Sequence, residues 1–70
     1  MQYMVVIEQG KTSFGAYVPD LPGCIAAGET EQEALELITE AIEFHLEGMK
    51  EEGMTIPSPH SYSTFVEVRA

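Results

Sequence analysis

One long, capped helix is the feature that most constrains this chain. Thr30 and Glu33 have the spacing of a capping box, in which a hydroxyl accepts a bond from the amide three residues later and a carboxylate reaches back. Gly53 is a residue type that ends helices, so the signals predict a helix over 31–52. Between these ends apolar residues recur at helical spacing: Leu35, Ile38, Ala41, Ile42, Leu46 and Met49. In a chain of 70 residues, the remaining segments must cover the apolar face of this helix.

Four short runs have the composition of β-strands, namely 2–9, 13–18, 24–28 and 62–69. The helix falls between the third and the fourth run. Three successive strands can form an antiparallel meander, and a right-handed crossover through the helix places the fourth run beside the first. The sequence therefore predicts a single α+β domain over 1–70, with the order β-β-β-α-β, sheet order 3-2-1-4 and the helix on one face.

A second apolar stripe lies beside the main apolar face of the helix. At about 100° per residue, Leu37, Ala41 and Phe44 fall between that face and an acidic one. A single sheet covers only one face of the helix. In addition, in a chain below roughly 70–80 residues one hydrophobic core contributes only about 3–5 kcal/mol to the free energy of unfolding. The single cysteine forbids an internal disulfide. We therefore expect a homodimer or homotetramer, with Leu37, Ala41 and Phe44 at the interface.

The charge of the chain is strongly negative. Twelve acidic residues face three basic ones, for a net charge of -9. Such a chain repels nucleic-acid phosphates and anionic membranes, so we expect it to bind neither directly. Along one helix face lie Glu36, Glu40, Glu43 and Glu47. This stripe is either a solvated face or a docking surface for a basic protein, and we take these four residues as candidate partner contacts.

The segment Pro19-Asp20-Leu21-Pro22-Gly23 is rich in turn residues. It predicts a rigid connector between the second and third strands. Turn formation is a sufficient reason for these residues. The same turn can also expose Asp20 and Leu21 at its tip, and we take these two residues as a second candidate contact for a partner.

No catalytic or metal-binding motif is present. Cys24 lies in a run of small residues and is expected to be a buried, inert thiol. His45 is expected in the core or at an interface, and His60 in a solvated loop without an evident partner. We therefore expect no catalytic residues, no metal, no cofactor and no enzymatic activity. The lone cysteine, and the lack of a signal peptide or a membrane-spanning run, favour the cytoplasm.

Several segments together carry a family resemblance. The run Tyr17-Val18-Pro19-Asp20-Leu21-Pro22-Gly23-Cys24 is followed by Gly28-Glu29-Thr30, Glu33-Ala34-Leu35 and Ala41-Ile42. With the opening Tyr3-Met4-Val5-Val6-Ile7-Glu8 and the later Ile56-Pro57-Ser58-Pro59, these residues resemble the HicB family of antitoxins. The connector and the helix start are specific in combination, and the match covers nearly the whole chain.

The resemblance implies a partial ribonuclease-H-like fold and a binding function. HicB-type proteins neutralise HicA toxins, which are small basic ribonucleases, so an acidic chain suits that partner. Many family members also carry a C-terminal DNA-binding domain, either ribbon-helix-helix or helix-turn-helix. The sequence given ends at Ala70, just after the predicted fourth strand. We therefore expect a protein-binding domain without its own operator-binding domain.

Two alternatives to the antitoxin hypothesis remain at this point. The first is an orphan oligomeric module that has no toxin partner. The second is a metal-dependent nuclease, for which the number of carboxylates is the only support.

Overall fold

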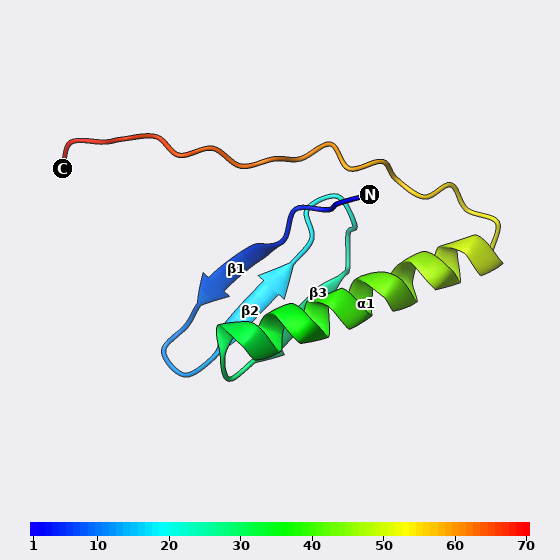
Figure 1. Ribbon diagram of the computed structural model, residues 1–70, viewed down its shortest axis with the longest axis horizontal. Helices are drawn as coiled ribbons and strands as arrows, with labels where there is room; N and C mark the ends of the chain where they lie inside the picture. Colours follow the sequence, from blue (N-terminus) through cyan, green and yellow to red (C-terminus); the bar gives the residue numbers. More distant parts are fainter.

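The computed structural model describes residues 1–70 and contains one sheet and one helix (Figure 1). The strands are β1 (Val6–Gln9), β2 (Phe14–Tyr17) and β3 (Ile25–Gly28), and the helix α1 spans Glu31–Glu51. Both strand pairs are antiparallel, and the sheet order is β1-β2-β3. Each element lies within its predicted run. The α+β class and the three-stranded meander are therefore confirmed.

Small residues let α1 approach the sheet closely. On the helix-facing side Ala16 of β2 pairs with Ala26 of β3, and Gly28 ends that strand. A Cβ atom added at Gly28 would lie 2.8 Å from the amide nitrogen of Ala34, closer than real Cβ contacts allow. Gly28 is therefore needed where the chain turns from β3 into the first turn of α1.

The helix begins and ends near the predicted positions. The Thr30 hydroxyl accepts a bond from the Glu33 amide at 3.0 Å. The Glu33 carboxylate accepts one from the Glu29 amide at 2.9 Å, one residue before the amide that a capping box uses. At the other end Glu52 caps the helix, and Gly53 has a φ of +72°, a conformation that favours glycine.

The core is small and lies toward the N-terminal half of α1. Six apolar residues are buried there: Ala16, Val18, Leu21, Cys24, Ala34 and Ile38. They come from β2, from the connector that follows it and from the first two turns of the helix. The C-terminal half of α1 continues past the end of the strands (Figure 1), so its apolar residues have no sheet beneath them.

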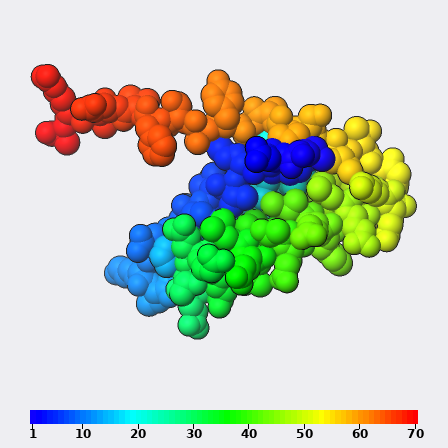
Figure 2. Space-filling model, in the orientation of Figure 1, coloured from blue at the N-terminus to red at the C-terminus, as the bar shows by residue number.

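The predicted fourth strand is not part of this sheet. Residues 62–70 are all exposed and run away from the body as an extended tail (Figures 1 and 2). The sheet order 3-2-1-4 is therefore not formed within the single chain, because the tail diverges from the free edge of β1. The radius of gyration, 13.9 Å, exceeds the roughly 11 Å typical of a compact chain of this length. We call residues 62–70 the tail from here on.

Candidate protein-binding site

The acidic stripe of α1 points into solvent. Its four members, Glu36, Glu40, Glu43 and Glu47, are all exposed. The buried residues of the helix, Ala34 and Ile38, lie on the opposite side, against the sheet. At 1.5 Å per residue the stripe is roughly 17 Å long, and its spacing keeps all four carboxylates on one face. The structure therefore brings together these predicted contacts as one accessible, negatively charged strip.

An apolar flank runs beside the acidic stripe. Phe44 is 80% exposed and Leu37 is 39% exposed, whereas Ala41 is partly buried against the core. An exposed phenylalanine next to a row of carboxylates is typical of a protein-binding surface, where an aromatic anchor sits beside charges that orient the partner. The structure leaves this flank uncovered, and its assignment to an oligomer interface stays a prediction.

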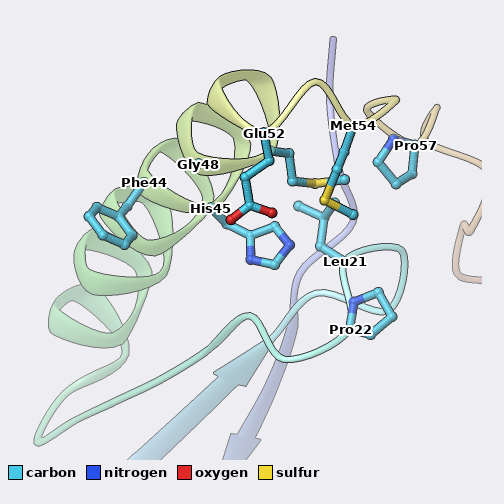
Figure 3. Close-up of a pocket in the computed structure, with 9 residues that line it drawn as sticks. Leu21, Pro22, Phe44, His45, Gly48, Glu52, Met54 and Pro57 are labelled. Atoms are coloured by element: carbon cyan, nitrogen blue, oxygen red, sulfur yellow. The ribbon is translucent and has the colours of Figure 1, made fainter.

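A groove of about 490 Å³ continues this apolar surface toward the end of the helix (Figure 3). Leu21 and Met54 point toward one another across it, and Phe44 projects from its far side (Figure 3). The other lining residues come from α1, the connector and the loop after the helix: Pro22, His45, Gly48, Met49, Glu52 and Pro57. The groove and the apolar flank share Phe44, and the polar side chains of His45 and Glu52 lie between Phe44 and the pair Leu21 and Met54 (Figure 3).

The expected exposed tip at Asp20 and Leu21 is wrong. Asp20 is 4% exposed and Leu21 is 1% exposed. The connector folds inward because the Leu21 amide donates to the Val18 carbonyl at 3.1 Å and the Cys24 amide to the Leu21 carbonyl at 3.1 Å. These tight turns put Leu21 into the core, so neither residue is available to a partner in this conformation.

Asp20 instead anchors the loop that follows the helix. Its carboxylate accepts bonds from the Ser61 hydroxyl, from the Ser61 amide at 2.9 Å and from the His60 amide at 2.8 Å. His60 Nε2 lies 3.1 Å from the same carboxylate, so the expectation that His60 has no partner is also wrong. Forty residues separate Asp20 from His60, and no local spacing signals such a contact.

These bonds lower the pKa of the Asp20 carboxyl. The hydrogen bonds from Ser61, side chain first and then backbone, lower the pKa of the carboxyl from 3.8 to about 2. The His60 amide and the nearby imidazole make smaller contributions to this lower pKa, and burial partly opposes the lowering. The anchor is therefore ionised at neutral pH, which is the form that accepts these bonds.

Comparison with known proteins decides the family. A sequence model described as the HicB-like antitoxin of bacterial toxin–antitoxin systems matches residues 3–69. The chain belongs to the HicB-like antitoxin family. It is 38% identical over 66 residues to an uncharacterised 14.9 kDa protein from the rep-hol intergenic region of Haemophilus phage HP1. That match covers 94% of this chain and 50% of the phage protein, so the HicB-like chain spans about half the length of this relative.

Two solved structures share the fold. The N-terminal domain of the Burkholderia pseudomallei antitoxin HicB matches with a TM-score of 0.73 and 30% identity, over 83% of this chain and 69% of that one. A chain of a HicA3 and HicB3 toxin–antitoxin complex matches with a TM-score of 0.67 and 32% identity, over 84% and 72%. The arrangement of sheet and helix is therefore that of a HicB N-terminal domain.

The remaining candidate residues of the HicB-like chain show no catalytic arrangement. Cys24 is a buried free cysteine, and burial raises the pKa of its thiol, which makes it a poor nucleophile. His45 is half-buried at the groove. No three His, Cys, Asp or Glu side chains converge closely enough to hold a metal ion. The helix α1 is not apolar enough to cross a membrane.

Proposed function

We propose that this HicB-like chain is an antitoxin that binds a small basic toxin of the HicA type and thereby blocks it. The observation that carries the proposal is the exposed acidic stripe of α1 beside Phe44, on a chain of the HicB-like family. The chain acts by binding rather than by catalysis, without cofactor or metal. It acts in the cytoplasm, where the buried Cys24 stays a free thiol.

Two physical effects support this assignment. A strip of carboxylates on a chain of net charge -9 attracts a basic protein and speeds their encounter. Charge alone gives little affinity, whereas the apolar flank at Leu37 and Phe44 offers area that a bound partner would remove from water. The likeness to a chain of a HicA3 and HicB3 complex makes a HicA-type protein the partner to test first.

The direct test is binding to a HicA-like protein from the same genome. The two chains are co-expressed, with an affinity tag on the toxin only. We expect the HicB-like chain to co-purify and toxin activity on RNA to fall as it is added. An orphan module would neither co-purify nor protect, and that result would overturn the proposal.

A matched pair of charge reversals tests the surface itself. The double variant Glu40→Lys/Glu47→Lys reverses two charges on the stripe, whereas Glu8→Lys/Glu29→Lys makes the same change of net charge on exposed residues outside the helix. At low salt we expect the stripe variant to slow association by about tenfold or more, since steering raises on-rates by 10–10³. The control should lose much less. Equal losses in the two variants would show that only net charge matters.

A further inference from the structure

The groove at the end of α1 combines apolar walls with a carboxylate. Phe44 lies on one side of it, and Leu21 and Met54 lie on the other (Figure 3). The Glu52 carboxylate and the His45 imidazole lie between them (Figure 3). The volume of about 490 Å³ is within the range of pockets that hold small ligands, so the groove has room for more than one side chain of a partner. These features suit an amphipathic side chain that is apolar along its length and charged at its end.

Gly48 keeps the groove open. It lies in the interior of α1, where glycine is the least favourable residue apart from proline. A Cβ atom added at Gly48 would meet no atom within 4 Å, so no contact inside the chain requires a glycine there. Because Gly48 lines the groove, a longer side chain at this position would fill part of it. The glycine therefore leaves room for a group from another molecule to lie against the helix.

The charges around the groove favour a cation. Glu52, the C-cap of α1, is exposed and lines the groove. Glu47 and Glu51 precede it on the same helix and are exposed as well. Lys50 is the only lysine or arginine of α1, and at about 100° per residue it lies on the far side of the helix from Glu52. None of the lining residues is a lysine or an arginine, so the groove attracts a positively charged group.

An arginine side chain fits these features better than a lysine. A guanidinium binds a carboxylate through two parallel N–H groups and stacks on aromatic rings, whereas an ammonium is a compact, strongly hydrated charge. Phe44 is 80% exposed, so its ring is accessible in the same groove as the Glu52 carboxylate. Leu21 and Met54 form an apolar patch for a neighbouring side chain, and the flexible thioether of a methionine adapts to different shapes.

We propose that the groove holds an arginine side chain of the basic partner, with an apolar residue next to that arginine packed on Leu21 and Met54. The guanidinium donates to the Glu52 carboxylate and lies against the Phe44 ring. Arginine and aromatic residues are the types that most often dominate binding energy, whereas exposed charges mainly steer encounter. The inference rests on the proposed function, since the partner is the proposed toxin, and it adds a contact outside the acidic stripe.

Two dipeptides test the groove without the toxin. The isotope-labelled full chain is titrated by NMR at about pH 8, where imidazoles carry little charge, with acetyl-leucyl-arginine amide or with its citrulline analogue, which is uncharged. We expect the arginine compound to shift the amide signals of Gly48, Met49 and Met54. It should bind about fivefold or more tightly than the citrulline compound, because its bond to Glu52 is charge-assisted. Equal affinity, or no binding of either compound, would overturn the proposal.

Two leucine variants of α1 test the groove in the toxin complex. Gly48→Leu fills the groove, and the fold should hold, because leucine favours a helix more than glycine does and its Cβ meets no atom within 4 Å. Thr39→Leu adds the same side chain to the exposed opposite side of α1 and is the matched control. We expect Gly48→Leu to lower the affinity for a HicA-like protein by about tenfold or more, and Thr39→Leu to change it by less than about twofold. Equal affinities would overturn the groove as a contact, while the proposed function would stand.

A pair of charge-removing variants tests the carboxylate itself. Glu52→Gln and Glu51→Gln remove the same charge at the same helix end, and of the two residues only Glu52 lines the groove. We expect Glu52→Gln to abolish the preference for the arginine compound over the citrulline compound, and Glu51→Gln to keep it. A preference that survives Glu52→Gln would overturn the proposed contact. A chain that prefers the arginine compound but binds no HicA-like protein would instead overturn the proposed function and support the arginine site.

Discussion

The connector between β2 and β3 and the tail after the loop form an instructive pair. Both lack regular secondary structure, and both contain apolar side chains between turn or polar residues. In the connector Leu21 is 1% exposed, whereas in the tail Phe65 is 98% exposed. The difference lies in the backbone: the connector satisfies its amides by short turns within itself, and the tail has no partner in its own chain.

The comparison of the connector with the tail shows that apolar side chains alone do not cause a segment to be buried. Burial removes backbone groups from water, and each of them then needs a hydrogen-bond partner. Val18, Leu21 and Cys24 find partners within six residues of one another, so Leu21 reaches the core at little cost. The tail needs another strand. Four measurements test this difference between the connector and the tail.

The largest effect is expected from Leu21→Ala in the connector. Leu21 is among the most deeply buried large side chains, so its loss leaves a cavity and should lower the free energy of unfolding by about 2–5 kcal/mol. Phe65→Ala removes a larger side chain from the tail and should change that free energy by less than about 0.5 kcal/mol in the monomer. Urea denaturation at low protein concentration measures both. An equal decrease in the free energy of unfolding for the two variants would show that the connector and the tail contribute equally to stability.

The second effect concerns the backbone of the connector. Gly23 has a φ of +86°, and a side chain in that region costs about 1–2 kcal/mol. Gly23→Ala should destabilise the chain by that amount, although no atom lies within 4 Å of the added methyl group. Gly15→Ala in β2 adds a methyl group that also meets nothing within 4 Å and should be neutral or slightly stabilising. Thermal unfolding distinguishes the two.

The third effect is a shift in the pKa of Asp20. Ser61 is the main cause of the low value, so Ser61→Ala should raise the pKa from about 2 toward 3.8. Because the folded-state pKa is depressed, the stabilisation from this anchor is present above pH 4 and is lost as the pH falls toward 2. Loss of the Ser61 hydroxyl reduces this pH-dependent stabilisation. NMR titration of the carboxyl reports the shift, and Ser63→Ala, in the tail, should leave the pKa of Asp20 unchanged.

The smallest effect is expected from removal of the tail. A chain that ends at Ser61 keeps both anchors of the loop and the whole core. Its unfolding free energy as a monomer should stay within about 0.5 kcal/mol of the full chain, because residues 62–70 bury almost nothing. Calorimetry of dilute samples tests this. A large loss would mean that the tail packs on its own body in solution.

The parts of the structure that sequence predicted correctly depend on local signals. Thr30, Glu33 and Gly53 lie within a turn of the helix ends that they define, and runs with the composition of β-strands marked the three strands. The acidic stripe also followed from helical spacing alone, because four residues on one face need no other element to place them.

The parts that sequence missed depend on contacts between distant residues. Turn chemistry predicted the connector but could not tell whether its tip faces water or the core, since Asp20 is held by His60 and Ser61. Pattern reasoning found the strand-like character of the tail but assumed that its partner was β1 of the same chain. A pattern of side chains shows that a strand needs an edge and does not show whose edge it is.

The hydrogen bond from the Tyr3 hydroxyl to the Pro57 carbonyl can form only late in the synthesis of the chain. It joins groups 54 residues apart, and the bond between Asp20 and the Ser61 amide spans 41. Hairpin and helix contacts are local and form in microseconds, whereas these two links need the loop to have left the ribosome. The sheet and helix can thus assemble early during synthesis. The loop is therefore the last part of the domain to fold, and its two hydrogen bonds form only after the whole loop has been synthesised.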